Sequence, residues 1–155
     1  RLVADAIGLT ADQIVTTTHP PTQASLGLPF VIAELPDRAT LTACRPVTDA
    51  FRAGAARHPA GLDFAIFVYA RENNNVDARM FAPLDNIPED PATGSAAATL
   101  AALLHEDLKT PQALNIRQGE DMGRLSLISA STTGTPPQVT ISGRAVLTME
   151  GRLAY

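Results

Sequence analysis

The sequence contains very little cysteine, lysine and tryptophan. It has one cysteine, Cys44, and no tryptophan, and Lys109 is the only lysine among twelve basic residues. A single cysteine excludes a disulfide within the chain, and the three histidines stand apart in sequence, so we predict no metal site. Lys109 lies in a polar segment. Because a Schiff-base lysine needs apolar surroundings, we expect no such role for it.

The sequence also lacks any run of basic residues. The other basic residues are arginines scattered singly from Arg1 to Arg152, and the net charge is −4. This distribution disfavours nucleic-acid binding, which needs clustered positive charge. The apolar runs are far shorter than the roughly 20 residues of a membrane-spanning helix, and no signal-peptide pattern is visible. We therefore expect a cytoplasmic protein with neither a nucleic acid nor a membrane as partner.

The residues that are present suffice for one folded domain. Hydrophobic residues make up 45% of the 155 residues, enough for one core. No internal repeat or long linker divides the chain, so we predict a single domain over residues 1–155. The chain begins at Arg1 and enters structured-looking sequence at once, from which we expect that an upstream part has been removed or lies on another piece.

The first half of the chain predicts short helices and strands. Gly8 closes a first helix and Thr10 can cap a further turn, while residues 15–18 are β-prone. Prolines and asparagines bound the other elements. These are a strand over 30–35, a helix over 49–56, a strand over 64–70 with apolar residues on both faces, and a strand over 76–81 that forms a hairpin with it.

The second half predicts one helix followed by four strands. The helix covers residues 94–105, and the strands cover residues 114–118, 124–130, 138–142 and 145–149, with glycine turns between them. This order fits an antiparallel meander around a single helix rather than repeated βα units. The fold class expected is therefore α+β.

The predicted helix is unusually apolar. Between Ala96 and Leu104, Thr99 is the only polar residue, and the others are alanine or leucine. A helix that is apolar all round is buried all round. We therefore predict a thin helix, wholly buried within a layer of strands.

The segment that enters this helix carries candidate site residues. Pro91 favours an extended Asp90 just outside the helix, and Thr93 or Ser95 can cap the first turn. The first N–H groups of a helix lack internal partners and favour an anion, and Glu89 and Asp90 place two carboxylates at the same end. On chemistry alone, a binding site and a plain helix cap are about equally supported.

The segment Glu89-Asp90-Pro91-Ala92-Thr93-Gly94-Ser95-Ala96 is highly specific, and Arg79-Met80-Phe81-Ala82-Pro83 precedes it. Together these segments resemble one known family, the PhzF-like isomerases of phenazine biosynthesis. Further similarity lies in segments 25–29, 118–124 and 143–146 and in the closing Glu150-Gly151. Leu125 departs from the proline that the family often has there, which affects turn rigidity more than chemistry.

The resemblance implies a diaminopimelate-epimerase-like fold. Such proteins have two similar domains, each a barrel-like sheet wrapped around a buried central helix, and this chain corresponds to the C-terminal half. The active site lies where the two helix N-termini face each other. Carried over residue by residue, Asp90 and Ser95 become catalytic candidates, and Thr93, Gly94 and Ser95 become substrate-binding candidates. The Gly94 and Ser95 amides would hold a carboxylate or oxyanion, while Asp90 would orient the substrate or relay a proton.

The implied chemistry is proton movement without a cofactor on a small carboxylate-bearing substrate. The family's main acid/base is a glutamate of the N-terminal domain, supported by a histidine in a glycine-histidine motif, and this chain does not contain that domain. His19 and His58 each precede a proline, do not match the motif, and are expected at the surface. His105 is expected to end the helix. Cys44 lies away from the loop where related racemases carry a thiol, so we expect a buried free thiol.

Two functions of different classes remain open. The first is an isomerase whose active site is shared with the missing N-terminal domain, in a protein that is expected to be a homodimer. The second is a non-catalytic half-module that binds a small carboxylate or a partner domain. For Arg79 and Arg117, we expect surface or inter-domain ion pairs ahead of a place in the cleft. Met80 and Phe81 are expected in the core, and Gln118 in a hairpin turn.

Overall fold

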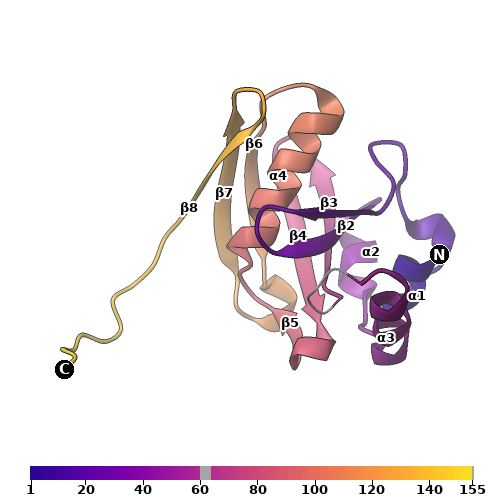
Figure 1. The fold of residues 1–155 in the computed structure, drawn as a ribbon, viewed down its shortest axis with the longest axis horizontal. Helices are drawn as coiled ribbons and strands as arrows, with labels where there is room; N and C mark the ends of the chain where they lie inside the picture. The colour runs from indigo at the N-terminus through magenta and orange to yellow at the C-terminus, as the bar shows by residue number, and fades with distance from the viewer. Residues whose placement is uncertain (60–63, 155) are drawn as a thin grey trace.

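The computed structural model describes residues 1–59 and 64–154, and Figure 1 shows its ribbon. The helices are α1 (Leu2–Ala6), α2 (Arg38–Ala43), α3 (Thr48–Arg57) and α4 (Gly94–Leu108), with 3-10 turns η1 (Ala11–Gln13), η2 (Pro83–Asp85) and η3 (Glu120–Met122). The strands are β1 (Thr22–Ser25), β2 (Pro29–Leu35), β3 (Ile66–Glu72), β4 (Asn75–Ala82), β5 (Ile87–Asp90), β6 (Ala113–Gln118), β7 (Ser126–Thr133) and β8 (Gln138–Gly143). The structure is therefore α+β, as predicted.

All of these strands belong to one sheet, and it is mixed rather than antiparallel. The order is β1-β2-β3-β4-β6-β7-β8, with β5 paired to β4. β2 pairs with β3 and β4 pairs with β6 in parallel, and the other pairings are antiparallel. The antiparallel meander expected after the helix is confirmed for β6, β7 and β8. An antiparallel sheet over the whole chain was wrong, because a helical crossover separates each parallel pair, α2 and α3 in one case and α4 in the other.

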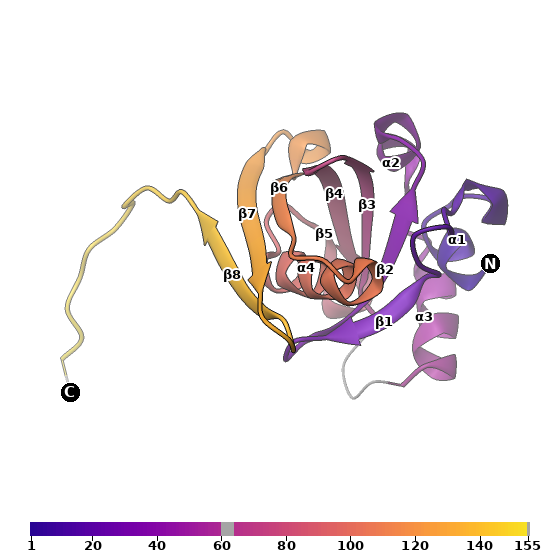
Figure 2. The same ribbon diagram turned by 90° about the horizontal axis from the view of Figure 1, so that it is seen from above.

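The sheet curls into a half-barrel with different helices on its two faces. Figure 2 shows α4 on the concave side and α1, α2 and α3 on the outside, beside β2 and β3. One core cluster joins α4 to the inner face of the sheet, and a second joins the outer helices to the opposite face. In β3, Phe67 and Tyr69 enter the first cluster while Ile66 and Val68 enter the second. This alternation confirms the prediction of a strand covered on both faces.

Helix α4 is apolar and largely enclosed. Its buried residues are Ala96, Ala97, Thr99, Leu100, Ala101, Ala102, Leu104 and His105. Ala98 and Leu103 are only half-buried and Ser95 is exposed. The helix continues past His105 to Leu108 and ends at a left-handed Lys109, so the predicted end at His105 was one turn early. Residues 106 and 107 are polar and exposed, so the last turn of the helix continues into solvent without burial. The apolar pattern that predicted the helix therefore did not reach its end.

Three other expectations were wrong. Residues 145–149 form no strand: they belong to a segment that extends away from the body beyond β8 in Figure 1. Residues 15–18 contribute only an isolated bridge between Val15 and Glu34. His19 is 3% exposed rather than at the surface. Its Nε2 lies 2.9 Å from the Tyr69 hydroxyl, so a buried polar partner compensates its burial.

Candidate functional site at the N-terminus of α4

Strand β5 delivers Asp90 to the start of α4. Asp90 is the last residue of β5 and pairs with Met80 of β4. Since paired residues share a face of the sheet and Met80 belongs to the α4-side core, Asp90 lies on the α4 side too. Pro91 then ends the strand, and α4 begins at Gly94. The expectation that Asp90 lies extended just outside the helix is confirmed.

The Asp90 carboxylate is held by Thr93, which is itself held by Gln118. The Thr93 hydroxyl donates to Asp90 Oδ2 at 2.5 Å. Gln118 Nε2 donates to Thr93 Oγ1 at 2.9 Å and to the Asp90 carbonyl at 2.7 Å. Gln118 Oε1 accepts the Thr93 N–H at 3.0 Å. The sequence predicted only a simple turn at Gln118. The alternation of β6 places Gln118 at a buried position, and a buried amide needs hydrogen-bond partners, which could have indicated its role.

The first turn of α4 has no side-chain cap among the described residues. Thr93 occupies the N-cap position, but its hydroxyl donates to Asp90 instead of accepting from the helix, so the expected capping role was wrong. Ser95 is exposed and its carbonyl accepts from Thr99 Oγ1 at 2.9 Å. The N–H groups of Gly94 and Ser95 therefore begin a helix whose positive dipole end is uncapped and adjoins a carboxylate-bearing loop.

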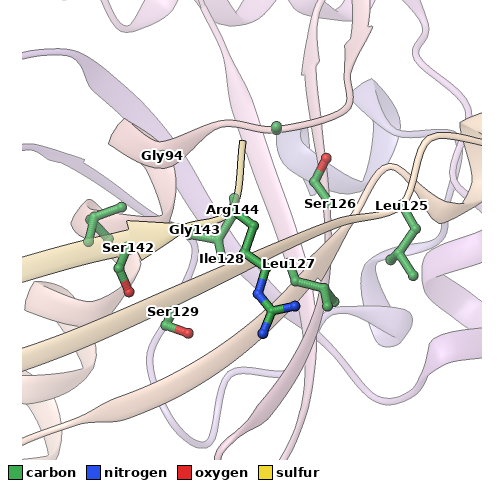
Figure 3. Close-up of a pocket in the computed structure, with 11 residues that line it drawn as sticks. Gly94, Leu125, Ser126, Leu127, Ile128, Ser129, Ser142, Gly143 and Arg144 are labelled. Carbon is green, nitrogen blue, oxygen red and sulfur yellow. The ribbon is translucent and has the colours of Figure 1, made fainter. Parts of the chain in front are cut away.

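A broad groove of about 940 Å³ adjoins this end of α4. Ala92 and Gly94 form its edge at the helix, and residues 125–129 and 141–144 form the remainder. Figure 3 shows Gly94, β7 and the end of β8 around it. Arg144 is the only charged side chain among its described lining residues. The lining does not include Asp90, Thr93 or Ser95. The groove therefore reaches the N-terminus of α4, which we call the helix mouth, at Gly94 and not at the Asp90 carboxylate.

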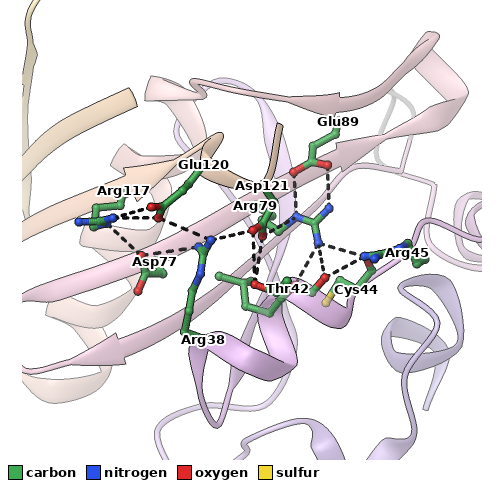
Figure 4. Close-up of polar contacts among 11 residues, drawn as sticks. Arg38, Thr42, Cys44, Arg45, Asp77, Arg79, Glu89, Arg117, Glu120 and Asp121 are labelled. Atoms are coloured by element: carbon green, nitrogen blue, oxygen red, sulfur yellow. Dashed lines mark hydrogen bonds and ion pairs between the residues drawn. The ribbon is translucent and has the colours of Figure 1, made fainter. Parts of the chain in front are cut away.

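Glu89 does not share the mouth with Asp90, contrary to expectation. The strand turns it to the opposite face, where Arg79 Nε and Nη2 donate to its two oxygens, both at 2.8 Å. Arg79 Nη1 also donates to the carbonyls of Leu41 and Cys44, at 3.0 and 3.1 Å. Figure 4 shows this arrangement. Arg79 therefore forms an ion pair, but the pair is buried within this chain and not at the surface or between domains as expected.

An outer ionic network surrounds this pair, and we define it as Arg38, Asp77, Arg79, Glu89, Arg117, Glu120 and Asp121. Arg38 Nη2 donates to Asp121 at 2.8 Å, and Arg117 Nη2 donates to Glu120 at 2.8 Å. The hydrogen bond and charge of Arg117 lower the pKa of Glu120. For Arg79, burial opposes the charged form, but the hydrogen bonds it donates to Glu89 and the charges of Glu89 and Asp121 outweigh burial and raise the pKa. The guanidinium therefore remains charged.

Gly119 brings the β6–β7 connection against the loop that carries the site. Its φ is +79°, and a Cβ there would lie 2.8 Å from the Pro91 carbonyl oxygen and would also meet the Arg124 carbonyl. Only glycine adopts this left-handed conformation without strain while allowing so close an approach. Gln118 and Gly119 together therefore fix the segment from Asp90 to Thr93.

The remaining candidates lie elsewhere. Cys44 is buried and free, as expected, and burial raises its thiol pKa to about 11. His58 is exposed, as expected, and His105 Nδ1 lies 2.8 Å from Thr132 Oγ1 inside the structure. Met80 and Phe81 are core residues. No group of three or more His, Cys, Asp or Glu side chains arranged to hold a metal ion occurs within residues 1–59 and 64–154.

Comparison with known proteins places the chain in a family. The family described as phenazine biosynthesis-like protein matches residues 2–151. An uncharacterized isomerase of Mesorhizobium japonicum is 33% identical, over 99% of this chain and 54% of its own length. A trans-2,3-dihydro-3-hydroxyanthranilate isomerase of Pseudomonas chlororaphis is 37% identical, over 75% of this chain and 41% of its own length. The chain belongs to the PhzF family of phenazine biosynthesis-like proteins and spans about half the length of these relatives.

Solved structures of the family share the fold. A phenazine biosynthesis protein of the PhzF family from Bacillus anthracis has a TM-score of 0.76 at 20% identity, covering 91% of this chain and 50% of that one. A protein described as a predicted epimerase from Pseudomonas aeruginosa has a TM-score of 0.66 at 27% identity, covering 97% and 52%. In the described part of the chain, no helix combines the length and apolarity needed to cross a membrane.

Proposed function

We propose that this chain forms one side of the active site of a cofactor-independent isomerase, which moves a proton on a small carboxylate-bearing substrate. The observation that carries the proposal is the pairing of Asp90, held by Thr93, with the uncapped N-terminus of α4. The relatives named as isomerases support the reaction class. The curled half-barrel is consistent with half of a diaminopimelate-epimerase-like protein.

The proposed roles follow from the chemistry of each group. The Gly94 and Ser95 amides and the Ser95 hydroxyl would bind the substrate carboxylate or the oxyanion that develops when a neighbouring carbon loses its proton. Asp90 would orient the substrate or relay the proton to its new position. One proton leaves one carbon and one is delivered to another, so the reaction needs no oxidant or reductant.

We further propose that the remainder of the intact protein completes the site. Two observations support a partner domain. The chain covers 54% and 41% of the two relatives described above. The segment after β8 exposes four large apolar side chains by 83–85%, namely Val146, Leu147, Met149 and Leu153. Exposed apolar groups in such number mark an interaction surface, and an N-terminal domain of the same protein would cover them. A homodimer of the whole protein is also proposed.

The second candidate is a non-catalytic half-module that binds a small carboxylate through the same helix mouth. It is favoured by the groove at Gly94, which contains Arg144 but no carboxylate among its described lining residues. Isothermal titration of this chain with small carboxylates, benzoate and anthranilate among them, tests it. Measurable heat that disappears in Arg144→Ala would favour this candidate, whereas the absence of heat at millimolar ligand would remove it.

The decisive test uses the intact protein that contains this chain. trans-2,3-Dihydro-3-hydroxyanthranilate, the substrate named for one relative, is the first substrate to assay, without added metal or cofactor and in deuterated water. We expect turnover with deuterium incorporation, lowered by about 10²–10⁴-fold in Asp90→Asn and by about 10-fold or more in Ser95→Ala. Wild-type rates for both variants would contradict the assignment of these residues.

A further inference from the structure

We infer that Gln118 is a positioning residue for Asp90, acting through Thr93; this rests on the proposed function. Gln118 is 1% exposed and ends β6. It pairs with Ala78 of β4, which belongs to the α4-side core. Its amide therefore reaches the site loop from the rigid sheet and not from the loop itself.

The hydrogen-bond polarity of this cluster allows one arrangement. The Thr93 N–H can only donate, so the atom facing it must be Oε1 of Gln118. The Asp90 carbonyl can only accept, so the atom facing it must be Nε2. These two backbone groups orient the amide without ambiguity.

The orientation of the amide then decides where the Thr93 proton goes. Nε2 has two protons: one is donated to the Asp90 carbonyl and the other to Thr93 Oγ1. Because Oγ1 already accepts a bond, the Thr93 proton is directed to Asp90 Oδ2, 2.5 Å away. The chain runs in one direction, from Gln118 through Thr93 to Asp90, and fixes one carboxylate oxygen. The other oxygen receives no bond from any residue described here and can face a substrate.

The close approach at Gly119 supports the same role. A Cβ on residue 119 would lie 2.8 Å from the Pro91 carbonyl oxygen, so the chain after β6 approaches the site loop closely at Gly119 as well as through the Gln118 amide. A displacement of about 1 Å at a reacting group can cost roughly 10²-fold in rate. Loss of the amide should therefore reduce turnover even though Gln118 touches no substrate.

Four variants of the intact protein test this inference, assayed for kcat, KM and thermal midpoint on trans-2,3-dihydro-3-hydroxyanthranilate. Gln118→Met and Thr93→Val each remove the relay, and we expect kcat to fall by about 10²-fold with KM changed less than about 3-fold. Thr93→Ser keeps the hydroxyl and should retain most of the activity. In the Asp90→Asn background, Gln118→Met should add less than about a 3-fold loss, because both act through one group.

The contrary results are equally specific. Folded Gln118→Met with wild-type kcat, equal losses in Thr93→Ser and Thr93→Val, or a full 10²-fold loss added to Asp90→Asn would each overturn the inference. If Gln118→Met does not fold, the Thr93 pair still decides. If the wild-type protein has no isomerase activity, the proposed function fails separately. Crystal structures of the Gln118→Met and Thr93→Ser variants then decide the positioning role, which predicts a displaced Asp90 carboxylate in the first alone.

Discussion

Glu89 and Asp90 are adjacent carboxylates on one strand, and they have entirely different surroundings. Glu89 faces outward and forms a two-bond ion pair with Arg79, whose side chain is 7% exposed against 16% for that of Glu89. Asp90 faces α4, where a hydroxyl holds one of its oxygens. The two-residue period of a strand is sufficient to separate a structural acid from a candidate catalytic acid.

The hydrogen bonds that each carboxylate accepts within the fold indicate how available it is to a ligand. Each Glu89 oxygen accepts from Arg79, and Arg79 is further fixed by backbone carbonyls and by contact with the Phe81 ring at 4.8 Å. A carboxylate with both oxygens engaged by a buried guanidinium inside the fold is less available to a ligand. Asp90, by contrast, is oriented by one bond to Oδ2, and its other oxygen accepts no bond from the described residues.

The largest effect on stability is expected from removing one partner of the Arg79–Glu89 ion pair. Glu89→Leu leaves the buried Arg79 guanidinium without its carboxylate, which should lower the free energy of unfolding by about 3 kcal/mol. For a chain of this size that corresponds to a fall of roughly 6–12 °C in the thermal midpoint. Calorimetry measures it. The double variant Arg79→Met/Glu89→Leu should recover much of the loss, and a double variant less stable than Glu89→Leu would contradict this account.

A smaller loss is expected on the side of the helix mouth from Gly119→Ala. The left-handed φ and the clash with the Pro91 carbonyl should together cost about 2 kcal/mol. Chemical denaturation compares it with Gly123→Ala, which has a similar φ of +69° but open space around a Cβ. Equal costs at the two glycines would show that the approach to Pro91 does not matter.

The reactivity of the Cys44 thiol reports whether the region around the Arg79–Glu89 pair is intact, without an activity assay. Its pKa is raised to about 11, chiefly by burial, so the thiolate is scarce at pH 8 and a thiol reagent should react very slowly with the native protein. The labelling rate should rise as the pH approaches 11. At pH 8, adding denaturant should expose the thiol and raise the rate. Glu89→Leu should label faster than Asp90→Asn. Fast labelling of native wild-type protein would mean that the outer side is open.

The smallest effect is expected at the solvent-facing part of the outer ionic network. Arg38 contacts Asp77, Glu120 and Asp121, but its side chain is 33% exposed. Arg38→Ala should therefore stay within about 2 °C of the wild-type midpoint. In 1 M salt the difference should vanish, because screening weakens exposed pairs. A fall in the thermal midpoint as large as that of Glu89→Leu would show that Arg38 contributes as much stability as the Arg79–Glu89 pair.

Local sequence rules predicted much of the fold and part of the site. The apolar run from Ala96 to Leu104 indicated α4, and Pro91 placed Asp90 outside it. Parallel pairing was missed because it depends on which strand a crossover reaches, and no local pattern records that. The side of the strand that Glu89 occupies depends on β5, a strand of four residues that two prolines had hidden. Residues 145–149 have strand-like sequence, but no neighbouring strand in the described structure pairs with them.

The polar contacts that were missed share a cause. Gln118 acts on residues 25 to 28 positions earlier in the chain, and His19 finds Tyr69 fifty positions later. Long-range polar pairing of this kind follows from the order of strands in the curled sheet and not from any short motif. Thr93 was correctly placed at the helix start, but its partner is a carboxylate that only the turn of β5 brings near.

The most direct test compares Glu89→Gln and Asp90→Asn in the intact protein, with thermal midpoint and turnover measured for both. We predict opposite patterns. Glu89→Gln should lower the midpoint by several degrees and keep kcat within about 3-fold, while Asp90→Asn should keep the midpoint within about 2 °C and lower kcat by about 10²-fold or more. A loss of activity in Glu89→Gln with Asp90→Asn fully active would contradict the division of the two carboxylates.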